Sequence, residues 1–322
     1  MSELGREMMK MTFDVMRQSA GLVRSLLPSE DSRVSWQEFQ NKLEAFTSFA
    51  YADTELGELA DVGLYEAIRA AAALGPYSSV WSMEGLGHRE AERRCKSHAH
   101  PRNLIPKDLP ARSLIPLHAG MGLSFACRAF ESGGDIRDRL ARFLDLCQAN
   151  SLEGHFGAAY EALGLIARNL YPEWVPSIDR ALEFDTDLLG YFWHGVGRGI
   201  YFVPTNFPTL ASAPWRCVSM AREEPPHELA SLNALAGLTW AFTLVNIRHP
   251  QLLAALVEHH RDELLRNDAY WNGLGSALMV WRMISPDDPS PDRFAPLDHS
   301  RDCNQPGEFF HYLEAWHELA TH

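Results

Sequence analysis

Six short glycine-containing segments recur along the chain at a nearly constant spacing, and this repeat limits the possible folds more than any other feature. Each segment has a polar residue, then glycine or alanine, then an apolar residue and a final glycine. The final glycines are residues 87, 122, 157, 197, 237 and 275, so neighbouring segments lie 35, 35, 40, 40 and 38 residues apart. A unit of about 38 residues has the size of a helix pair in a repeat protein, whereas strands would not need so long a period. The segments are residues 84–87, 118–122, 153–157, 194–197, 233–237 and 272–275.

The stretches between the glycine segments have the pattern of amphipathic helices. In residues 136–147 and 252–265 the apolar side chains recur at steps of three and four. Prolines cluster between the units, where a missing backbone N–H does least harm. We therefore predict an all-α fold of tandem helix-pair repeats of about 35–40 residues, forming an α/α-toroid or an α-solenoid. Each glycine segment is expected to open a helix, with its glycines allowing close approach of neighbouring helices.

The periodic region suggests three parts. Residues 1–60 are predicted to be N-terminal capping helices, residues 61–283 the six-fold repeat domain, and residues 284–322 a proline-rich loop with a C-terminal helix at 308–319. Residues 8–16 form an amphipathic pattern typical of a capping or dimerising helix, and a helix lying on a bilayer surface is the alternative. A homo-oligomer is therefore possible.

Charge and cysteine content narrow the range of partners and locations. With 42 acidic and 29 basic side chains the net charge is −13, which disfavours nucleic acid and anionic membranes as partners. The five cysteines contain no Cys-x-x-Cys pair, and acidic residues occupy the extreme N-terminus, so we predict reduced thiols in a cytoplasmic protein. Residues 229–247 are uncharged, but they include several polar side chains, and we predict a buried core helix rather than a transmembrane segment.

The polar residue before each glycine pair is the main candidate for function, because equivalent positions of a repeat share one face. These residues are Glu84, His118, Glu153 with His155, His194, Asn233 and Asn272. Imidazoles and carboxylates that converge in an apolar concave lining would form a ligand pocket, and they are also ligands that zinc and iron accept. The alternative is that each polar group caps its own helix, which explains the asparagines well and the histidines least. We assign no metal, and the cofactor is unknown.

Arg198 completes the predicted ligand-binding set, since a guanidinium in an apolar segment would be buried only if paired. Its partner is expected to be Glu161 or a carboxylate of the ligand. Three other chemistries are disfavoured. None of the glycine segments follows a strand as a dinucleotide fingerprint would, the chain has no Gly-x-Ser-x-Gly elbow or phosphate loop, and Cys95-x-x-His98-x-His100 fits the solvated end of a helix better than a zinc site.

Several of these segments, in this order, resemble a known family. The resemblance covers about residues 45–283 and rests on residues 49–51, 83–87, 116–122 and 154–157, and most strongly on His194-Gly-Val-Gly-Arg-Gly-Ile-Tyr-Phe202. The chain is similar to the domain-of-unknown-function family found in enediyne polyketide biosynthesis cassettes. This resemblance implies a cytoplasmic biosynthetic protein that acts on or around a polyene precursor, and it implies no settled chemistry.

Two functions are compatible with these observations. In the first, the chain binds or modifies an apolar polyene intermediate of enediyne-like polyketide metabolism in the cavity of a helical repeat fold. In the second, it is a non-catalytic helical-repeat scaffold that binds a partner protein. A pocket lined by His118, His155 and His194 would favour the first function, and exposed aromatic side chains on the inner helices would favour the second.

Overall fold

The computed structural model describes residues 30–297 apart from 53–54, 99 and 207–212. These residues form helices and contain no strand, which confirms the all-α prediction. The α-helices are α2 (Glu30–Tyr51), α3 (Glu55–Val62), α4 (Leu64–Ala72), α5 (Pro76–Ser97), α6 (Ala111–Glu131), α7 (Ile136–Asn150), α8 (Phe156–Tyr160), α9 (Ala162–Leu170), α10 (Val175–Leu182), α11 (Thr186–Phe202), α12 (Ala213–Glu223), α13 (Glu228–Val245), α14 (Pro250–His259), α15 (Arg261–Leu264) and α16 (Asp268–Ile284). Three 3-10 helices are η1 (Pro172–Trp174), η2 (Pro204–Asn206) and η3 (Ser290–Leu297).

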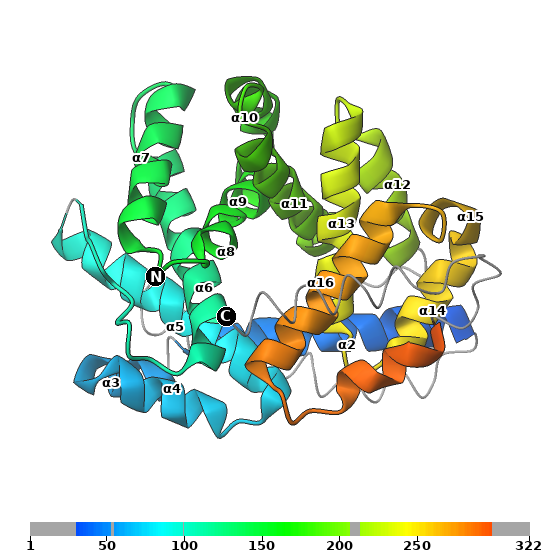
Figure 1. Cartoon of the computed structure of the whole chain (residues 1–322), viewed down its shortest axis with the longest axis horizontal. Coiled ribbons are helices and arrows are strands. Elements are labelled where there is room, and N and C mark those ends of the chain that lie inside the picture. Colours follow the sequence, from blue (N-terminus) through cyan, green and yellow to red (C-terminus); the bar gives the residue numbers. More distant parts are fainter. Residues whose placement is uncertain (1–29, 53–54, 99, 207–212, 298–322) are drawn as a thin grey trace.

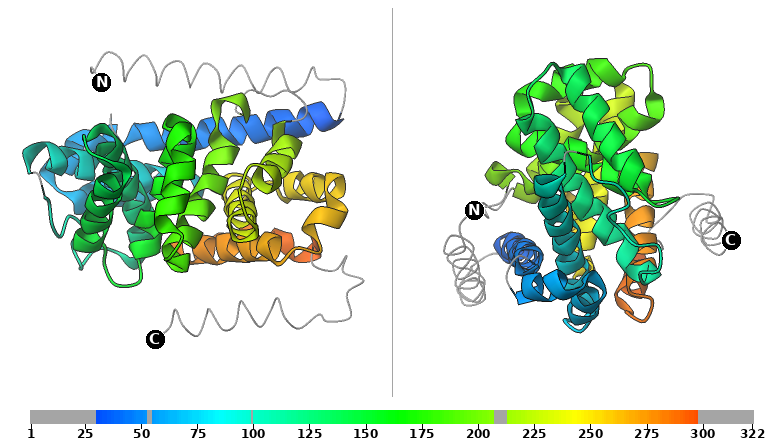
Figure 2. Two further views of the ribbon diagram at one scale, coloured as in Figure 1. Left: turned by 90° about the horizontal axis from the view of Figure 1, so that it is seen from above. Right: turned by 90° about the vertical axis from the view of Figure 1, so that its left-hand side faces the viewer.

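The glycine-containing helices pack on one another in chain order. Helix α5 packs on α6, α6 on α8 and α9, α9 on α11, α11 on α13, and α13 on α16. Helices α7, α10 and α12 extend to one side of this series, at the top of Figure 1. Helices α2 and α16 lie along opposite sides of the molecule in the left view of Figure 2.

The glycine segments lie in the middle of helices, and the prediction that they open helices is wrong for all but the third. Their position follows from helix geometry, because residues two apart in a helix point about 200° apart. In α11 a Cβ on Gly195 would lie 1.9 Å from the carbonyl oxygen of Glu161, and a Cβ on Gly197 would lie 1.9 Å from that of Ala234. One glycine of the Gly-x-Gly pair therefore faces the preceding helix and the other faces the following one.

The third repeat and the first inter-helix connection differ from the predicted pattern. Residues 153–157 form a turn and the start of α8, and the equivalent backbone contact is made by Gly164, where a Cβ would lie 2.0 Å from the carbonyl oxygen of Phe192. Residues 98–110, between α5 and α6, contain no described helix, so this unit is not a helix pair. Three prolines in this connection explain why, since each removes a backbone donor and disfavours the helical conformation of the residue before it.

Helix α2 is tied to the far end of the series by buried polar contacts. Asn41 donates to Asn246 (2.8 Å), and Tyr77 of α5 donates to the carbonyl oxygen of Val245 (2.8 Å). Lys42 is fully buried, lies 2.8 Å from the Glu38 carboxylate and packs over the Tyr201 ring. These contacts join the start of the described chain to the C-terminal end of α13.

The proposed capping and C-terminal parts are described only in part. Residues 1–29 and 298–322, with the predicted helices at 8–16 and 308–319, lie outside the described residues. Within the predicted proline-rich loop, η3 forms instead of an extended connection. Asp288 accepts hydrogen bonds from Trp281 and Ser290, and these bonds hold the turn before η3 against the end of α16.

Helix α13 corresponds to the long uncharged stretch of the sequence. Among the described helices it alone is long and apolar enough to cross a membrane, judged by length and composition, with a mean hydropathy of 1.3. Two thirds of it is buried between neighbouring helices of the protein, as a core helix would be.

Candidate functional site

One face of α11 descends from the surface into the protein. Tyr191, His194 and Arg198 follow one another at steps of three and four residues, so their side chains line the same face of the helix. Tyr191 is exposed, His194 is partly buried, and Arg198 is buried with 4% of its side chain accessible. The face therefore forms a path that runs from an aromatic ring at the surface to a guanidinium in the interior.

Two carboxyl groups from outside α11 meet this face. Arg198 Nη1 donates to Glu161 Oε2 over 3.0 Å, and the second Glu161 oxygen lies 3.2 Å from His194 Nδ1. Glu84, from α5, places Oε1 3.8 Å from Arg198 Nη2. Trp240, from α13, lies against the Arg198 guanidinium at 4.5 Å and meets the His194 ring edge to face. We call these five residues the Arg198 cluster.

The backbone contacts at the glycines place these side chains. Glu161 stands between α8 and α9, where its carbonyl oxygen touches α11 at Gly195, next to His194. Glu84 occupies the position before Gly85 on α5, just as His194 precedes Gly195 on α11. Because the Gly-x-Gly pair faces both neighbouring helices, the residue before it points out of the row of helices. The polar residues at these two positions therefore project to the same region.

The two carboxyl groups have opposite electrostatic environments. Burial raises the pKa of Glu84, and the Arg198 guanidinium, 3.8 Å away, offsets this only in part. Burial also disfavours the charged form of Glu161, but the neighbouring His194 and Arg198 side chains, with the hydrogen bond from Arg198, outweigh it, and the pKa of Glu161 lies below its usual value. A pair of acids whose pKa values are driven apart can divide the roles of proton donor and proton acceptor.

Several polar atoms of the Arg198 cluster lack hydrogen bonds within the described structure. Glu84 is 7% exposed, yet its carboxyl makes no hydrogen bond to a described residue. Arg198 Nε is also buried without a partner, and His194 Nδ1 faces Glu161 without a well-aligned hydrogen bond. The Glu84 side chain keeps 10% of its area accessible, so its carboxyl has hydrogen-bonding capacity that a ligand's polar group can use.

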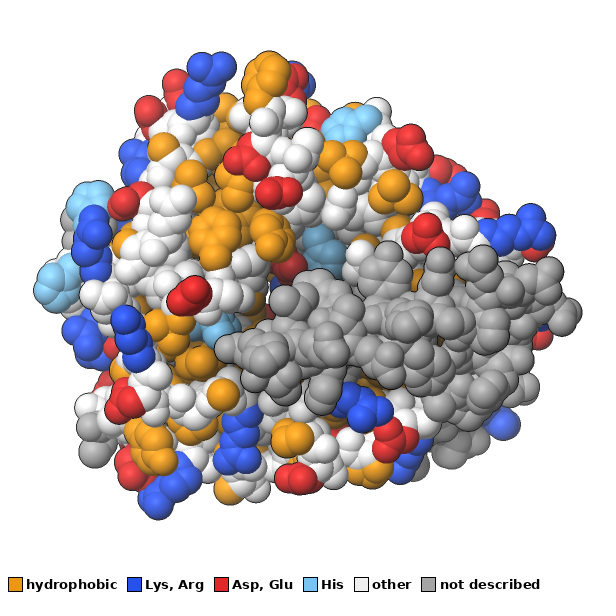
Figure 3. All heavy atoms as spheres, viewed as in Figure 1, with side chains coloured by type: hydrophobic (Ala, Val, Ile, Leu, Met, Phe, Trp, Pro, Cys, Tyr) orange, Lys and Arg blue, Asp and Glu red, His pale blue; other side chains and the backbone are white. Residues whose placement is uncertain are grey.

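The molecular surface near these helices is hollowed and lined in part by apolar side chains. Figure 3 shows a hollow near the middle of the face, with histidine and acidic side chains at its depth and hydrophobic side chains beside it, over α8 and the start of α11. Phe156 stacks on Tyr160, and Tyr160 meets the exposed Tyr191 edge to face. An aromatic rim therefore adjoins the path along α11.

The predicted histidine pocket divides into two places. His118 lies apart from the Arg198 cluster and is completely buried at the turn before α8. Its Nε2 accepts from the N–H of Leu152 (3.0 Å), its Nδ1 contacts the carbonyl oxygen of Leu114 (2.6 Å), and its ring stacks on His155. Nε2 thus holds the turn to α6, while Nδ1 is engaged within α6 itself. The reason is register: Ala119, not His118, stands three residues before Gly122, so the His118 ring points about 100° away from the equivalent of Glu84.

We expect His118 to make stability pH-dependent. Burial lowers its pKa to about 4, with the hydrogen bond to Leu114 opposing and His155 assisting the shift. Between about pH 6.5 and 4 the unfolded chain takes up a proton that the folded protein excludes, so the free energy of unfolding should fall by about 3 kcal/mol as the pH is lowered. Urea titrations across this range should show a smaller pH dependence in His118→Asn. The exposed His100→Asn should keep the wild-type dependence, and equal slopes in all three proteins would contradict the assignment.

The remaining predicted residues do not join either place. Glu153 is exposed on the turn before α8. Asn233 and Asn272 lie within α13 and α16 and do not cap them, and α13 is instead capped by His227, whose Nδ1 accepts from Ala230. A histidine can therefore cap a helix in this chain, contrary to the premise used for the pocket.

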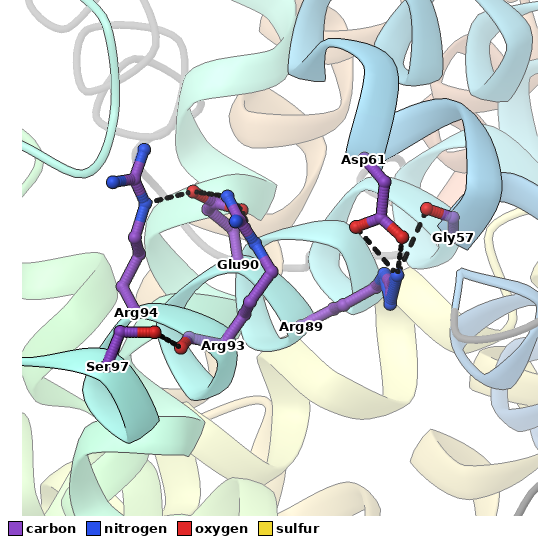
Figure 4. Close-up of polar contacts among 7 residues, drawn as sticks. All are labelled: Gly57, Asp61, Arg89, Glu90, Arg93, Arg94 and Ser97. Carbon is purple, nitrogen blue, oxygen red and sulfur yellow. Dashed lines mark hydrogen bonds and ion pairs between the residues drawn. The ribbon is translucent and has the colours of Figure 1, made fainter.

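The segment with three histidines and Cys95 behaves as the charged end of a helix. Figure 4 shows Glu90 between Arg93 and Arg94, and Arg89 reaching Asp61 and the carbonyl oxygen of Gly57 on α3. Cys95 is buried, whereas His98 and His100 are exposed. Among the described residues no group of three or more histidine, cysteine or acidic side chains is placed to hold a metal ion.

Glu161 is central to the Arg198 cluster, although we expected it only as a possible partner of Arg198 and not as a repeat position. Residues 161–164, Glu-Ala-Leu-Gly, match the repeat pattern better than residues 153–157 do. Taking Gly164 as the third anchor would have placed Glu161 beside Glu84 and His194 in the set of equivalent polar residues. Trp240 has no such signal, because it follows the fifth anchor by three residues and lies on an apolar helix.

Comparisons with known proteins give no match, whether with family models, with curated proteins or with solved structures.

Proposed function

We propose that the chain is a biosynthetic protein of enediyne-like polyketide metabolism that binds an apolar polyene intermediate above the Arg198 cluster. The observation that carries this proposal is the Glu84 carboxyl, which makes no hydrogen bond to a described residue and has 10% of its side chain accessible, at the inner end of a path whose outer end is aromatic. A polyene with one polar end fits such a site, because its chain would cover the aromatic rim and its polar group would satisfy the buried donors and acceptors. The resemblance of residues 194–202 to the enediyne-associated family supports the metabolic setting, with a cytoplasmic location.

The same proposal favours a toroid over a solenoid. Helices α5, α11 and α13 and the junction of α8 and α9 all contribute side chains to the Arg198 cluster. Helix α16 also packs against α6, and Trp281 of α16 lies beside Tyr77 of α5. Contacts between helices from the beginning and the end of the series are expected when the series of helices closes into a ring, as in a toroid, and not when it stays open. Distances between spin labels on α3 and α14, on either side of the row, would test this curvature.

We expect the protein to bind all-trans-retinol, a conjugated polyene alcohol whose fluorescence rises in an apolar site. Tyr191→Ala should weaken binding about tenfold, because it removes an aromatic contact at the rim. Tyr65→Ala removes another exposed ring, on α4, and is the control, with unchanged affinity expected. Fluorescence titration gives both affinities. A signal that does not saturate, or an equal loss in both variants, would contradict the proposed site.

The alternative is a scaffold that grips a partner protein. The observation in its favour is a set of exposed apolar side chains, among them Phe184, which is 92% exposed between α10 and α11, and Leu170 at the end of α9. In a scaffold the Arg198 cluster serves stability alone. The wild-type protein would then bind no polyene, so the retinol titration separates the two functions.

A further inference from the structure

The Arg198 cluster has a donor side and an acceptor side. On the donor side, the Arg198 guanidinium lies beside the Glu84 carboxyl. On the acceptor side, His194 turns Nδ1 toward the Glu161 carboxylate, 3.2 Å away. This contact favours the tautomer with the proton on Nδ1 and leaves Nε2 with a lone pair, as in the histidine–carboxylate pairs of general bases. No hydrogen bond joins Nε2 to another described residue.

We propose that the ligand is a β,γ-unsaturated carbonyl compound and that the Arg198 cluster shifts its double bond into conjugation with the carbonyl group. This inference rests on the proposed function and names its substrate class and reaction. His194 Nε2 removes a proton from the carbon between the carbonyl and the alkene. The C–H electrons form a dienolate whose negative oxygen is held by Arg198 and Glu84. The protonated His194 imidazole exchanges this proton with solvent and delivers a proton to the γ carbon, which leaves a conjugated carbonyl compound with no net oxidation or reduction.

The roles follow from the contacts of each group. A buried carboxyl with no hydrogen bond and only a long contact to a cation is best kept neutral, and the raised pKa of Glu84 agrees with this. A neutral carboxyl can donate to an oxygen that becomes negative during the reaction. Glu161 stays charged between Arg198 and His194, so it can orient the imidazole and stabilise its protonated form. Glu161 is thus a positioning residue, while His194, Glu84 and Arg198 would touch the substrate.

Other polar ends fit less well. A hydrocarbon would leave the Glu84 and Arg198 donors without partners. A carboxylate would bring a third acid to a guanidinium that Glu161 already neutralises. A ketone or aldehyde accepts hydrogen bonds without adding charge until the proton is removed. The hydrogen bonds from Glu84 and Arg198 therefore strengthen as negative charge develops on the carbonyl oxygen, so they stabilise the transition state more than the bound substrate.

The test uses the full-length protein and a linear β,γ-unsaturated methyl ketone in heavy water. Formation of the conjugated enone is followed by its ultraviolet absorption, and deuterium at the γ carbon by NMR. We expect conversion by the wild type above the buffer rate. His194→Ala and Glu84→Ala should each lower the rate about 100-fold or more, while Glu84→Gln, which retains a donor, should lose less. Glu90→Gln, on the same helix and paired with arginines, and His260→Ala, from another histidine–glutamate pair, should keep the wild-type rate.

The outcomes separate this inference from the proposed function. Circular dichroism of each variant shows whether a lower rate results from a loss of helical structure. The comparison of retinol binding with ketone conversion uses the wild-type protein alone. If the wild-type protein binds retinol but neither converts nor deuterates the ketone, the reaction proposed here is wrong and the binding function stands. If the wild type binds neither compound, the proposed function fails as well. Equal rates in His194→Ala and wild type would also overturn the reaction, because the proton would then have another acceptor.

Discussion

Replacing Gly197 with alanine is expected to destabilise the protein, although alanine is the better helix former. The new Cβ would lie 1.9 Å from the carbonyl oxygen of Ala234 and 2.8 Å from the N–H nitrogen of Leu238. Both are backbone atoms of α13, so no side-chain rotation can make room. Helices α11 and α13 must separate, and we expect a loss of about 1–3 kcal/mol in the free energy of unfolding. Leucine at this position should cost more.

The matched control is Gly190→Ala on the same helix. There the nearest atom to a new Cβ is the Asn233 side-chain oxygen at 3.5 Å, an ordinary contact. Alanine at this position should raise the free energy of unfolding by up to about 1 kcal/mol, because glycine is a poor helix former. Urea denaturation of the two variants should therefore shift the midpoint in opposite directions. Shifts in the same direction would show that helix propensity, not backbone contact, governs position 197.

Among substitutions that remove one charged side chain, Arg198→Met is expected to lower the free energy of unfolding the most. Glu161 would lose the cation that offsets its burial, and removing one partner of a buried pair typically costs about 3–5 kcal/mol. The remaining stability should also fall at a higher pH than in the wild type. In the wild type the lowered pKa of Glu161 contributes stability above the pKa of the unfolded chain, and this contribution is lost as the pH falls. Without Arg198 the pKa of Glu161 should rise.

Two further variants make the Arg198 result specific. Arg93→Met removes a half-exposed partner of Glu90 on the surface, and it should change stability by no more than about 1 kcal/mol. Adding Glu161→Leu to Arg198→Met removes the unpaired charge and should recover part of the loss. Thermal and urea unfolding of the single and double variants measure both effects. A double variant no more stable than Arg198→Met would mean that the loss comes from packing rather than from an uncompensated carboxylate.

The repeat of glycine segments was sufficient to predict helices, because close helix contact requires missing side chains at intervals along the chain. It was not sufficient to place the helix ends. A glycine can start a helix or lie at a crossing, and only the neighbouring backbone distinguishes the two, as at Gly195 and Gly197. In the first unit the prolines of residues 98–110 prevented a second helix, and the period alone did not show this.

The candidate site was predictable where the register of the repeat was correct. Glu84 and His194 directly precede the first glycine of their segments, and both reach Arg198 or its partner. His118 stands one position further from its glycines, and a shift of one residue in a helix turns a side chain by about 100°. Whether that imidazole then meets a ligand or a backbone amide depends on the turn at Leu152, which no pattern in the sequence predicts.

The contacts at the paired glycines also bear on how the charged groups of α11 can move. Where backbone meets backbone, as between α11 and its neighbours α9 and α13, no rotamer change can absorb a small displacement. A shift of α11 must therefore be shared by the helices on both sides. The packed helices therefore hold His194 and Arg198 against Glu161 before any ligand binds. The free-energy cost of bringing these polar groups together is part of folding and does not reduce the affinity for a ligand.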